Sequence, residues 1–478
     1  MSNMQLLALL PLLIPAGAAV LVLLGVALKR SFGATFFLSL LAFTAGFAAL
    51  FTPGSAVMIP SLLTVDHYAR YFMGLTFLSN FVVTLLAYRY IAEYGENREE
   101  FFLLLLLETI GALVLVSSTH FASLFLGYEI TSVSLYGLIG YNRLKERSIE
   151  AGVKYLILGG VSSAFLLFGM ALVYADLGTM ALDQLSTGIM KAGGVSRLAL
   201  VGISMIIVGI GFKLAWVPFH MWTADVYQGA PVPVTASLTT VSKIAVFALL
   251  IRLFHGIPIL DYPALYWMFA IIAGFSMLLG NWLALMQRNV KRMLAYSSIS
   301  HFGYLILPLL AGGERGAESA AFYLTAYTVA TLGSFGVLTV LSNPQREHET
   351  MEDFDGLGRQ RPMISAVFTF MLLSLAGIPV TIGFIGKFFL LRAGLGSSLW
   401  ALSLILVAGT SISFFYYLRL VVLLFRRGEA DEREVKDSKV VSLAEHSVMV
   451  FLVTLLVGFG AYPAPLIRLI QAMMRVIG

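Results

Sequence analysis

Four charged residues lie deep inside apolar stretches of the sequence. Glu129, Lys213, Lys243 and Lys387 each sit well within such a stretch, and a bilayer core needs about 20 helical residues to cross it. A charge at the centre of a bilayer costs about 2.5–3.5 kcal/mol on insertion scales. These side chains must therefore be paired, hydrated or both. A lysine balanced between burial and a nearby carboxylate can release and regain a proton, so the four residues predict a proton relay.

Two simpler interpretations remain open for these residues. Lysines near helix ends can extend their amines to the membrane surface, although three lysines near mid-segment fit this poorly. A static ion pair joins Glu129 to one lysine but leaves the other two without an evident acid. The relay accounts for all four, with Glu129 as the carboxylate that approaches and withdraws.

Two further charged residues are candidates for the same relay. Glu108 lies within the apolar segment 101–118 and is either a second relay acid or a carboxylate hydrated at a shallow depth. Lys154 begins the segment 152–175 beside Glu150, where it either feeds protons inward or extends to the surface.

Two histidines are also candidates, because an imidazole titrates near physiological pH. His220 ends the segment 198–222, and His301 lies in the first half of the segment 291–312. The alternatives are that both are packing residues or that they form an axial haem pair. Asp225 follows His220 and is expected to organise the tight turn into the next segment.

The composition of the chain indicates that the helices carrying these residues lie in lipid rather than in water. The 478 residues are 59% hydrophobic and 12% charged, and the mean hydropathy is +0.89. A soluble surface cannot be built from this composition, so a polytopic all-α membrane protein is expected. The chain has no cysteine, which excludes thiolate-held iron–sulfur clusters, disulfides and Cys-type zinc sites within it. No metal site and no nucleotide-binding motif is evident. The basic residues lie in short loops, which argues against nucleic-acid binding.

Counting apolar runs predicts about fourteen transmembrane segments. Their approximate bounds are 5–28, 32–52, 68–92, 101–118, 121–141, 152–175, 198–222, 232–256, 263–287, 291–312, 318–342, 363–391, 399–425 and 445–471. The first segment lacks a positively charged start and exceeds a signal-peptide core, so we expect it to be retained. Odd-numbered loops hold eighteen lysines and arginines against seven in the even-numbered loops and tails. The positive-inside rule then predicts cytoplasmic odd loops and both termini on the periplasmic side.

Segments 4–8 and 9–13 predict two five-helix units, of which the second enters the membrane from the opposite face. Such inverted repeats are common in transporters. The expected divisions are an N-terminal three-helix part, 1–100, a first repeat, 101–256, a second repeat, 257–425, and a C-terminal loop with the last helix, 426–478. Pro218 in segment 7 and Pro379 in segment 12 predict broken helices, because proline frees backbone groups that neighbours or water must satisfy.

Long motifs in this sequence resemble a known family. They run from Gly211 to Pro231, through Val241-Ser-Lys243, from Asn289 to Tyr304, and from Leu375 to Lys387. They are similar to those of the antiporter-like membrane subunits of NADH:quinone oxidoreductase, respiratory complex I, and among these to the subunit N branch. The lysine at position 387 favours the N or L branches over M, and the end of the chain soon after segment 14 favours N over L.

The resemblance implies a proton-translocating subunit of an NADH:quinone oxidoreductase, with no redox centre in this chain. Glu129 would pair with Lys213, Lys243 would continue the path, His301 would join its polar axis, and Lys387 would deliver the proton outward. FMN, iron–sulfur clusters and quinone would lie in partner subunits. The partners would include subunit M and small subunits such as K and J, in a bacterial inner membrane and surrounded by lipid. Glu108 departs from the family pattern.

Two rival functions stay open. A subunit of a multisubunit cation/proton antiporter shares the same glutamate and lysines, and should exchange sodium without redox turnover. A structural or quinone-site subunit without pumping activity should tolerate the loss of Lys213.

Overall fold

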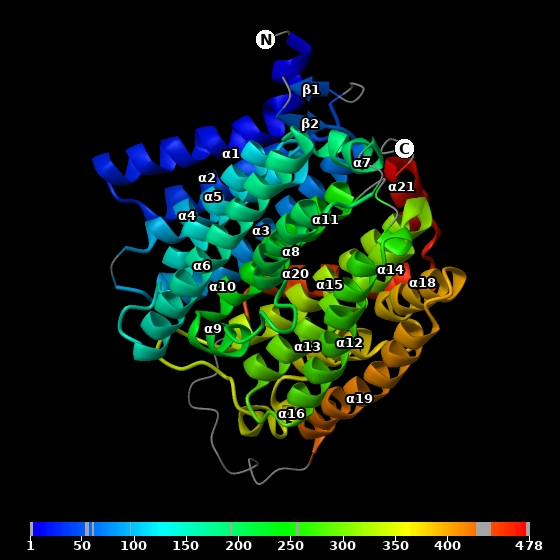
Figure 1. The fold of residues 1–478 in the computed structure, drawn as a ribbon. Helices are drawn as coiled ribbons and strands as arrows, with labels where there is room; N and C mark the ends of the chain where they lie inside the picture. Colours follow the sequence, from blue (N-terminus) through cyan, green and yellow to red (C-terminus); the bar gives the residue numbers. More distant parts are fainter. Residues whose placement is uncertain are drawn as a thin grey trace.

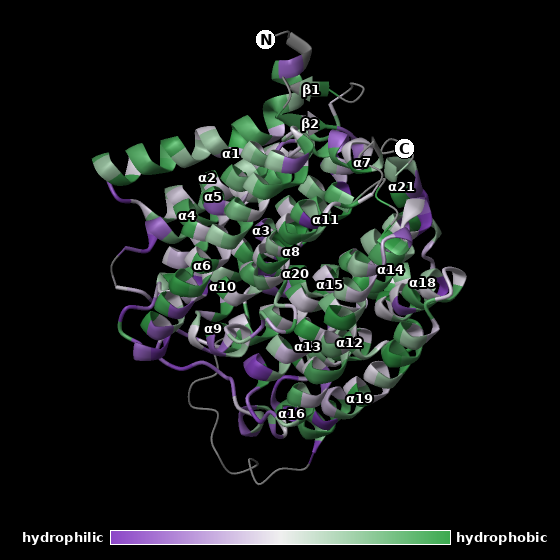
Figure 2. Cartoon of the chain, in the orientation of Figure 1, coloured by the Kyte–Doolittle hydropathy of each residue, from purple (hydrophilic) through white to green (hydrophobic). Residues whose placement is uncertain are grey.

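The protein is an all-α bundle of membrane-spanning helices, as its composition predicts. The computed structural model describes residues 3–52, 57–59, 62–95, 97–191, 194–254, 257, 259–426 and 441–474. Within these residues, thirteen helices are long and apolar enough to cross a membrane. Helix α1 lies on one side of the bundle and α19 on the opposite side (Figure 1). Most residues along the helices are hydrophobic, whereas hydrophilic residues gather at the end where α9 and α16 lie (Figure 2). We call this the polar end.

The N-terminal part packs against the first unit and contains a hairpin that apolar counting did not predict. Its elements are α1 (Asn3–Leu28), α2 (Phe32–Ala49), β1 (Val57–Ile59), β2 (Leu63–Val65) and α3 (His67–Ala92). The two strands pair antiparallel. Asp66 caps α3 by accepting from the Ala69 amide at 2.7 Å.

The first five-helix unit contains predicted segments 4 to 8. Its elements are α4 (Glu99–Ser117), α5 (Phe121–Ile139), α6 (Glu146–Leu177), α7 (Leu182–Lys191), α8 (Arg197–Leu214), α9 (Thr223–Gly229), α10 (Val232–Ser237), the π-helix η1 (Leu238–Ser242) and α11 (Lys243–Phe254). Helix α7 was not predicted. It is short and amphipathic, and buries Leu182, Leu185 and Ile189 against the core.

The second unit contains predicted segments 9 to 13. Its elements are the 3₁₀ turn η2 (Ile259–Asp261), α12 (Pro263–Leu285), α13 (Val290–Tyr304), α14 (Ile306–Ala311), α15 (Gly313–Leu341), the 3₁₀ turn η3 (Met351–Phe354), α16 (Leu357–Gln360), α17 (Pro362–Ala376), α18 (Ile382–Gly396) and α19 (Trp400–Phe425). Residues 343–350 cross the polar end between α15 and η3, and we call them the strap.

The same helix pairings recur in the two units. Helix α4 packs on α5 and α11, as α12 packs on α13 and α19, and α6 packs on α8 as α15 packs on α18. Each unit crosses the membrane an odd number of times, so the second begins on the opposite face. Nearly all residues of the spans Val232–Phe254, Val290–Ala311 and Gly313–Leu341 are buried. Lys243 and His301 therefore lie in the centre of the protein.

Both helices that proline was expected to break are broken. Helix α8 ends at Leu214, its C-cap Ala215 has a left-handed φ of 61°, and α9 begins only at Thr223. Helix α17 ends at Ala376, its C-cap Gly377 has a φ of 85°, and α18 begins at Ile382. Neither α17 nor α18 is long enough to span a membrane alone, so together they form the predicted segment 12.

The last predicted segment, 445–471, is wrong as a single helix. It consists of α20 (Leu443–Ala461) and the short amphipathic α21 (Ala464–Met474). Pro463 lies between them and cannot continue the hydrogen-bond ladder of α20. Most of the predicted C-terminal loop, 427–440, lies outside the described residues.

Candidate functional site

Lys213 occupies the last turn of α8, directly before the break. Its side chain is 2% exposed, and its Nζ donates to the Tyr155 hydroxyl at 3.1 Å. The same ammonium lies 5.1 Å from the ring centre of Tyr128 and 5.2 Å from that of Tyr155. Hydroxyl oxygens and aromatic faces thus replace the water that a buried amine loses.

Glu129 and Lys213 do not form the ion pair that the sequence suggested. Glu129 is half-buried on α5 and accepts a short hydrogen bond from the Ser163 hydroxyl on α6. Among the ion pairs of the described residues, none joins Glu129 to Lys213. The acid and the base are therefore separated in this conformation, each satisfied by a hydroxyl group on a neighbouring helix.

Glu108 is fully buried on α4 and belongs to a separate polar chain. The Ser237 hydroxyl lies 2.6 Å from Glu108 Oε2 and 2.7 Å from Asn80 Oδ1, and Asn80 Nδ2 donates to Thr109 at 2.7 Å. One hydroxyl proton serves only one acceptor. When Glu108 is protonated, its own O–H donates to Ser237, which then donates to Asn80, and both contacts are satisfied. Glu108 is thus enclosed by the protein, and its role in the relay stays a prediction.

Lys243 begins α11, immediately after the π-helix η1. Its Nζ donates to the Ser298 hydroxyl at 2.7 Å and lies 3.5 Å from the Leu214 carbonyl, at the broken end of α8. Ser298 also lies 2.8 Å from the Tyr327 hydroxyl and 3.4 Å from that of Tyr227. Ser298 is therefore the point where α9, α11, α13 and α15 contribute polar groups to one position.

His301 lies one helical turn beyond Ser298 on α13. Its Nδ1 is 2.6 Å from the Tyr323 hydroxyl and its Nε2 is 3.3 Å from the Tyr417 hydroxyl. Tyr417 in turn makes a short contact with the Ser297 hydroxyl. Both ring nitrogens are therefore hydrogen-bonded to phenols, which can donate or accept.

Lys387 lies on α18 and is 6% exposed. Its Nζ donates to the Leu375 and Ala376 carbonyls at 2.9 Å and 3.0 Å, and it lies 5.6 Å from the Tyr304 ring centre. These carbonyls belong to the last turn of α17 and have no intrahelical partner. The lysine therefore satisfies the backbone groups that the break leaves open.

His220 does not join this layer of buried groups. It is half-buried in the broken part of segment 7, and its Nδ1 has no hydrogen-bond partner within the described part of the chain. The described residues contain no cluster of three or more metal-ligating side chains. Because both ring nitrogens of His301 are engaged by tyrosines, the geometry does not favour an axial haem pair.

Lys154 forms a charged cluster at the polar end. Its Nζ lies 2.5 Å from Glu150 and 2.9 Å from Asp225, and Arg292 lies 2.7 Å from the other Asp225 oxygen. Partial burial raises the pKa of Asp225, but the hydrogen bonds from Lys154 and Arg292 outweigh it and leave that pKa below its usual value. Asp225 therefore ties α9 to α6 of the first unit and to α13 of the second, and the turn that it was expected to organise stays a prediction.

The contacts form four groups rather than one continuous wire. Lys213 with Tyr155, Lys243 with Ser298, His301 with two tyrosines, and Lys387 with the α17 carbonyls follow each other through the protein. Sequence reasoning missed the hydroxyl partners. Two features of the sequence could have identified them. Tyr323 and Tyr327 are four residues apart and so lie on one face of α15, and Ser297 and Ser298 are polar residues within α13.

The chain is similar to membrane subunits of known complexes. A family model described as NADH:quinone oxidoreductase/Mrp antiporter, TM matches residues 118–413. NADH-quinone oxidoreductase subunit N of Ectopseudomonas mendocina (strain ymp) is 43% identical over 98% of this chain and 96% of that protein.

Solved structures with the same fold come from several complexes. A chain of respiratory complex I from Thermus thermophilus with bound aureothin is 29% identical, with a TM-score of 0.81 over 96% of this chain and 98% of that chain. A chain of the Mrp complex from Dietzia sp. DQ12-45-1b is 20% identical, with a TM-score of 0.87 over 98% of this chain and 97% of that chain. At that identity the second likeness concerns the fold alone.

Proposed function

The chain belongs to the NADH:quinone oxidoreductase/Mrp antiporter family, and within it to the subunit N group of respiratory complex I, and from this premise we propose that it translocates protons through its buried lysines. It is thus an antiporter-like membrane subunit of an enzyme complex. Electron transfer from NADH to quinone, with FMN, iron–sulfur clusters and quinone, is assigned to partner subunits. Its own residues would move protons only.

One observation carries the proposal: Lys213, Lys243 and Lys387 are buried, and none lies in an ion pair within the described ranges. Their partners are hydroxyl groups or carbonyl oxygens. A carboxylate in contact would hold a lysine in its charged form. A hydroxyl accepts from an ammonium and donates to a neutral amine, so it tolerates both states. Such surroundings suit a group that must gain and lose a proton.

We place the steps in the order of the contact groups. Glu129 and Glu108 would exchange protons with Lys213 through water, and the Leu214 carbonyl beside Lys213 lies 3.5 Å from Lys243 Nζ. Ser298 and His301 carry the proton across the centre, and Lys387 passes it outward. Water would fill the gaps between the groups. Lys154 lies at the proposed entrance, but its contacts with Glu150 and Asp225 hold it in the charged form, so we assign it no proton-transfer step. His220 lies outside the buried layer, and its Nδ1 has no hydrogen-bond partner within the described residues, so we assign it no step.

The polar end is proposed to face the cytoplasm and both termini the periplasm of a bacterial inner membrane. The excess of lysine and arginine in the odd-numbered loops supports this orientation. Subunit M and small subunits such as K and J are the proposed neighbours. The second candidate, a cation/proton antiporter subunit, shares the fold with the Mrp chain but at only 20% identity, against 43% for the subunit N relative.

The test replaces Lys213 by alanine in the native complex. NADH-driven quinone reduction and proton uptake are measured together in inverted membrane vesicles, per assembled complex on native gels. We expect both rates to fall more than about tenfold, equivalent to about 1.4 kcal/mol of barrier. Lys29→Ala, at an exposed position in the turn after α1, is the matched control and should behave as wild type.

Normal rates in assembled Lys213→Ala complexes would contradict the relay. Sodium uptake is then measured in the same vesicles without NADH, because exchange that is independent of redox turnover would favour the antiporter function instead.

A further inference from the structure

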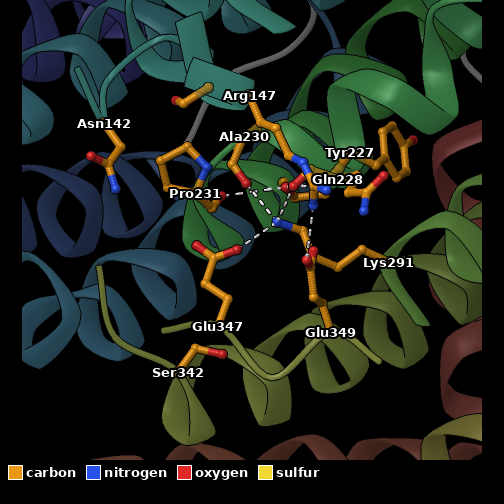
Figure 3. Close-up of polar contacts among 12 residues, drawn as sticks. Asn142, Arg147, Tyr227, Gln228, Ala230, Pro231, Lys291, Ser342, Glu347 and Glu349 are labelled. Carbon is orange, nitrogen blue, oxygen red and sulfur yellow. Dashed lines mark hydrogen bonds and ion pairs between the residues drawn. The ribbon is translucent and has the colours of Figure 1, made fainter. Parts of the chain in front are cut away.

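A fully buried lysine at the polar end is not part of the relay. Lys291, in the first turn of α13, is 0% exposed. Its Nζ donates to Glu347 Oε2 at 2.9 Å, to the Gln228 carbonyl at 3.0 Å and to the Ala230 carbonyl at 2.6 Å. An ammonium has three N–H groups, so all of its donors are used. Figure 3 shows the three contacts converging on the amine.

The carboxylate in this cluster comes from the strap. Glu347 is 8% exposed and also accepts a short hydrogen bond from the Tyr90 hydroxyl on α3. Burial raises its pKa, but the charge of Lys291, with smaller contributions from Lys145 and Tyr90, leaves that pKa below its usual value. The ion pair therefore persists at neutral pH. The strap itself is fixed by backbone contact, since the Val290 amide donates to the Glu349 carbonyl at 2.6 Å.

The two carbonyls that Lys291 binds belong to the turn between α9 and α10. Gln228 lies in the last turn of α9, where carbonyls lack intrahelical partners, and Ala230 directly follows it. Pro231 closes the turn and cannot donate a backbone hydrogen bond. A side-chain donor from the second unit therefore fixes the backbone of the first unit at the turn that leads from α9 into segment 8.

That turn carries a residue of the central polar group. Tyr227, next to Gln228, is fully buried, points its hydroxyl at Ser298 over 3.4 Å, and lies with its ring centre 5.7 Å from Lys243 Nζ. Thr235 of α10 donates to the Tyr227 carbonyl at 3.2 Å. Moving the turn would therefore move both Tyr227 and the helix that leads through η1 to Lys243.

We infer that Lys291 is a positioning residue for proton transfer at Lys243, and that it acts through the Gln228–Ala230 turn and Tyr227. The inference rests on the proposed function, because it assigns Lys291 a role in that same path. Lys291 itself does not carry the proton. It sets where Tyr227 places its ring and hydroxyl beside Lys243 and Ser298.

Stability alone does not explain this arrangement. Burying an ion pair costs desolvation energy that the attraction between the charges often only offsets, and apolar residues of similar size are frequently as stable. An ammonium with three N–H donors can hold two carbonyl oxygens of the first unit at a fixed distance from α13 of the second unit, which an apolar side chain cannot do. The Lys291–Glu347 pair therefore contributes a defined position of the Gln228–Ala230 turn rather than stability.

The experiment uses the whole complex in inverted vesicles. Lys291→Met removes the donors at similar length, and Arg147→Met is the matched control, because Arg147 contacts the same strap at Glu349 over 3.4 Å but is 70% exposed. Lys243→Met reports on the proposed function itself. NADH-driven proton uptake is measured per assembled complex from pH 6 to 9.

We expect Lys291→Met to lower proton uptake more than about tenfold and to displace its pH profile, while Arg147→Met changes neither. A purely structural role would reduce the amount of assembled complex but leave the profile per complex unchanged, and that result would overturn the inference. If Lys243→Met pumps normally, the proposed function fails. If only Lys291→Met pumps normally, this inference alone fails.

A charge exchange separates positioning from simple ion pairing. In the double variant Lys291→Glu, Glu347→Lys, the pair is restored but an acceptor faces the Gln228 and Ala230 carbonyls, so we expect no recovery. Recovery would overturn the inference. Should Lys291→Met fail to assemble, Lys291→Gln keeps two N–H donors without charge and is judged by the same displacement of the pH profile.

Discussion

At the scale of single residues, the buried lysines depend on hydroxyl groups that occupy neighbouring helices. Ser298 is the most connected of these, since Lys243, Tyr327 and Tyr227 all reach its oxygen. Sequence reasoning found the lysines because charge inside an apolar run is rare. It missed Ser298 because serine is common in membrane helices, where it usually bonds to its own backbone.

Ser298→Ala should slow proton translocation strongly while leaving the fold intact. The change removes the oxygen shared by one lysine and two tyrosines, and each buried polar group left without a partner costs about 1–3 kcal/mol. We expect proton uptake per assembled complex to fall about tenfold or more. Ser411→Ala, which removes an exposed hydroxyl bonded only to the backbone of α19, is the control. Equal rates in the two variants would exclude Ser298 from the path.

At the scale of elements, the broken helices are the part of the site that the sequence predicted best. Pro218 and Pro379 marked both interruptions, because proline cannot continue a hydrogen-bonded helix. The separation of Glu129 from Lys213 was not predictable, since it depends on how α5, α6 and α8 pack and on which hydroxyl each side chain finds. The π-helix before Lys243 also leaves no clear mark in the sequence.

Gly377→Ala should disturb the second break. The residue has a φ of 85°, and a Cβ there would lie 2.9 Å from Cδ of Lys387. A left-handed conformation costs a residue with a Cβ about 1–2 kcal/mol. We expect the thermal midpoint of the complex and its proton uptake both to fall. Gly17→Ala, where a Cβ meets nothing within 4 Å, should leave both quantities unchanged, and a harmless Gly377→Ala would mean that the break adapts freely.

The strap should loosen in mild acid because of His348. Its side chain is partly buried, and burial lowers its pKa more than Asp353 raises it, so the net pKa lies below the usual value. The closed strap therefore favours the neutral form of His348. In an opened strap the exposed imidazole would take up a proton near pH 6.5. The free energy that keeps the strap closed must then decrease as the pH falls below about 6.5.

Hydrogen exchange of the strap amides measures this effect. After correction for the intrinsic pH dependence of exchange, we expect faster exchange at pH 5.5 than at 7.5. His348→Asn should abolish the difference. Glu347 does not account for it, because its pKa is already below the usual carboxyl value and it stays charged throughout this range.

At the scale of the whole molecule, the two units share one set of helix pairings and one polar end. Apolar periodicity predicted the number and order of the crossings well, because about 20 apolar residues are a strong signal. It misjudged the last segment, where Pro463 ends α20 early, and overlooked the short α7. Both errors concern short amphipathic helices, α7 and α21, which apolar content alone does not distinguish from part of a span.

The proposed orientation of the chain in the membrane can be tested by labelling introduced cysteines, because the natural chain has none. Arg346→Cys lies in the strap at a side chain that is 76% exposed, and Glu314→Cys lies at the opposite end of α15. In inverted vesicles, a maleimide that cannot cross membranes should label position 346 and spare 314. In right-side-out spheroplasts the pattern should reverse. The same label at both positions, or the reverse order, would contradict the assigned topology.

The contact of Lys387 with the open end of α17 has a mechanical consequence. Its ammonium holds the Leu375 and Ala376 carbonyls at 2.9 Å and 3.0 Å, so the charge on one nitrogen contributes to the shape of the bent backbone. Linkage works in both directions. Any distant movement that changes the geometry of the break between α17 and α18 must therefore change the proton affinity of Lys387 Nζ. A mechanical displacement of the helix then has the same effect on this amine as a change of pH.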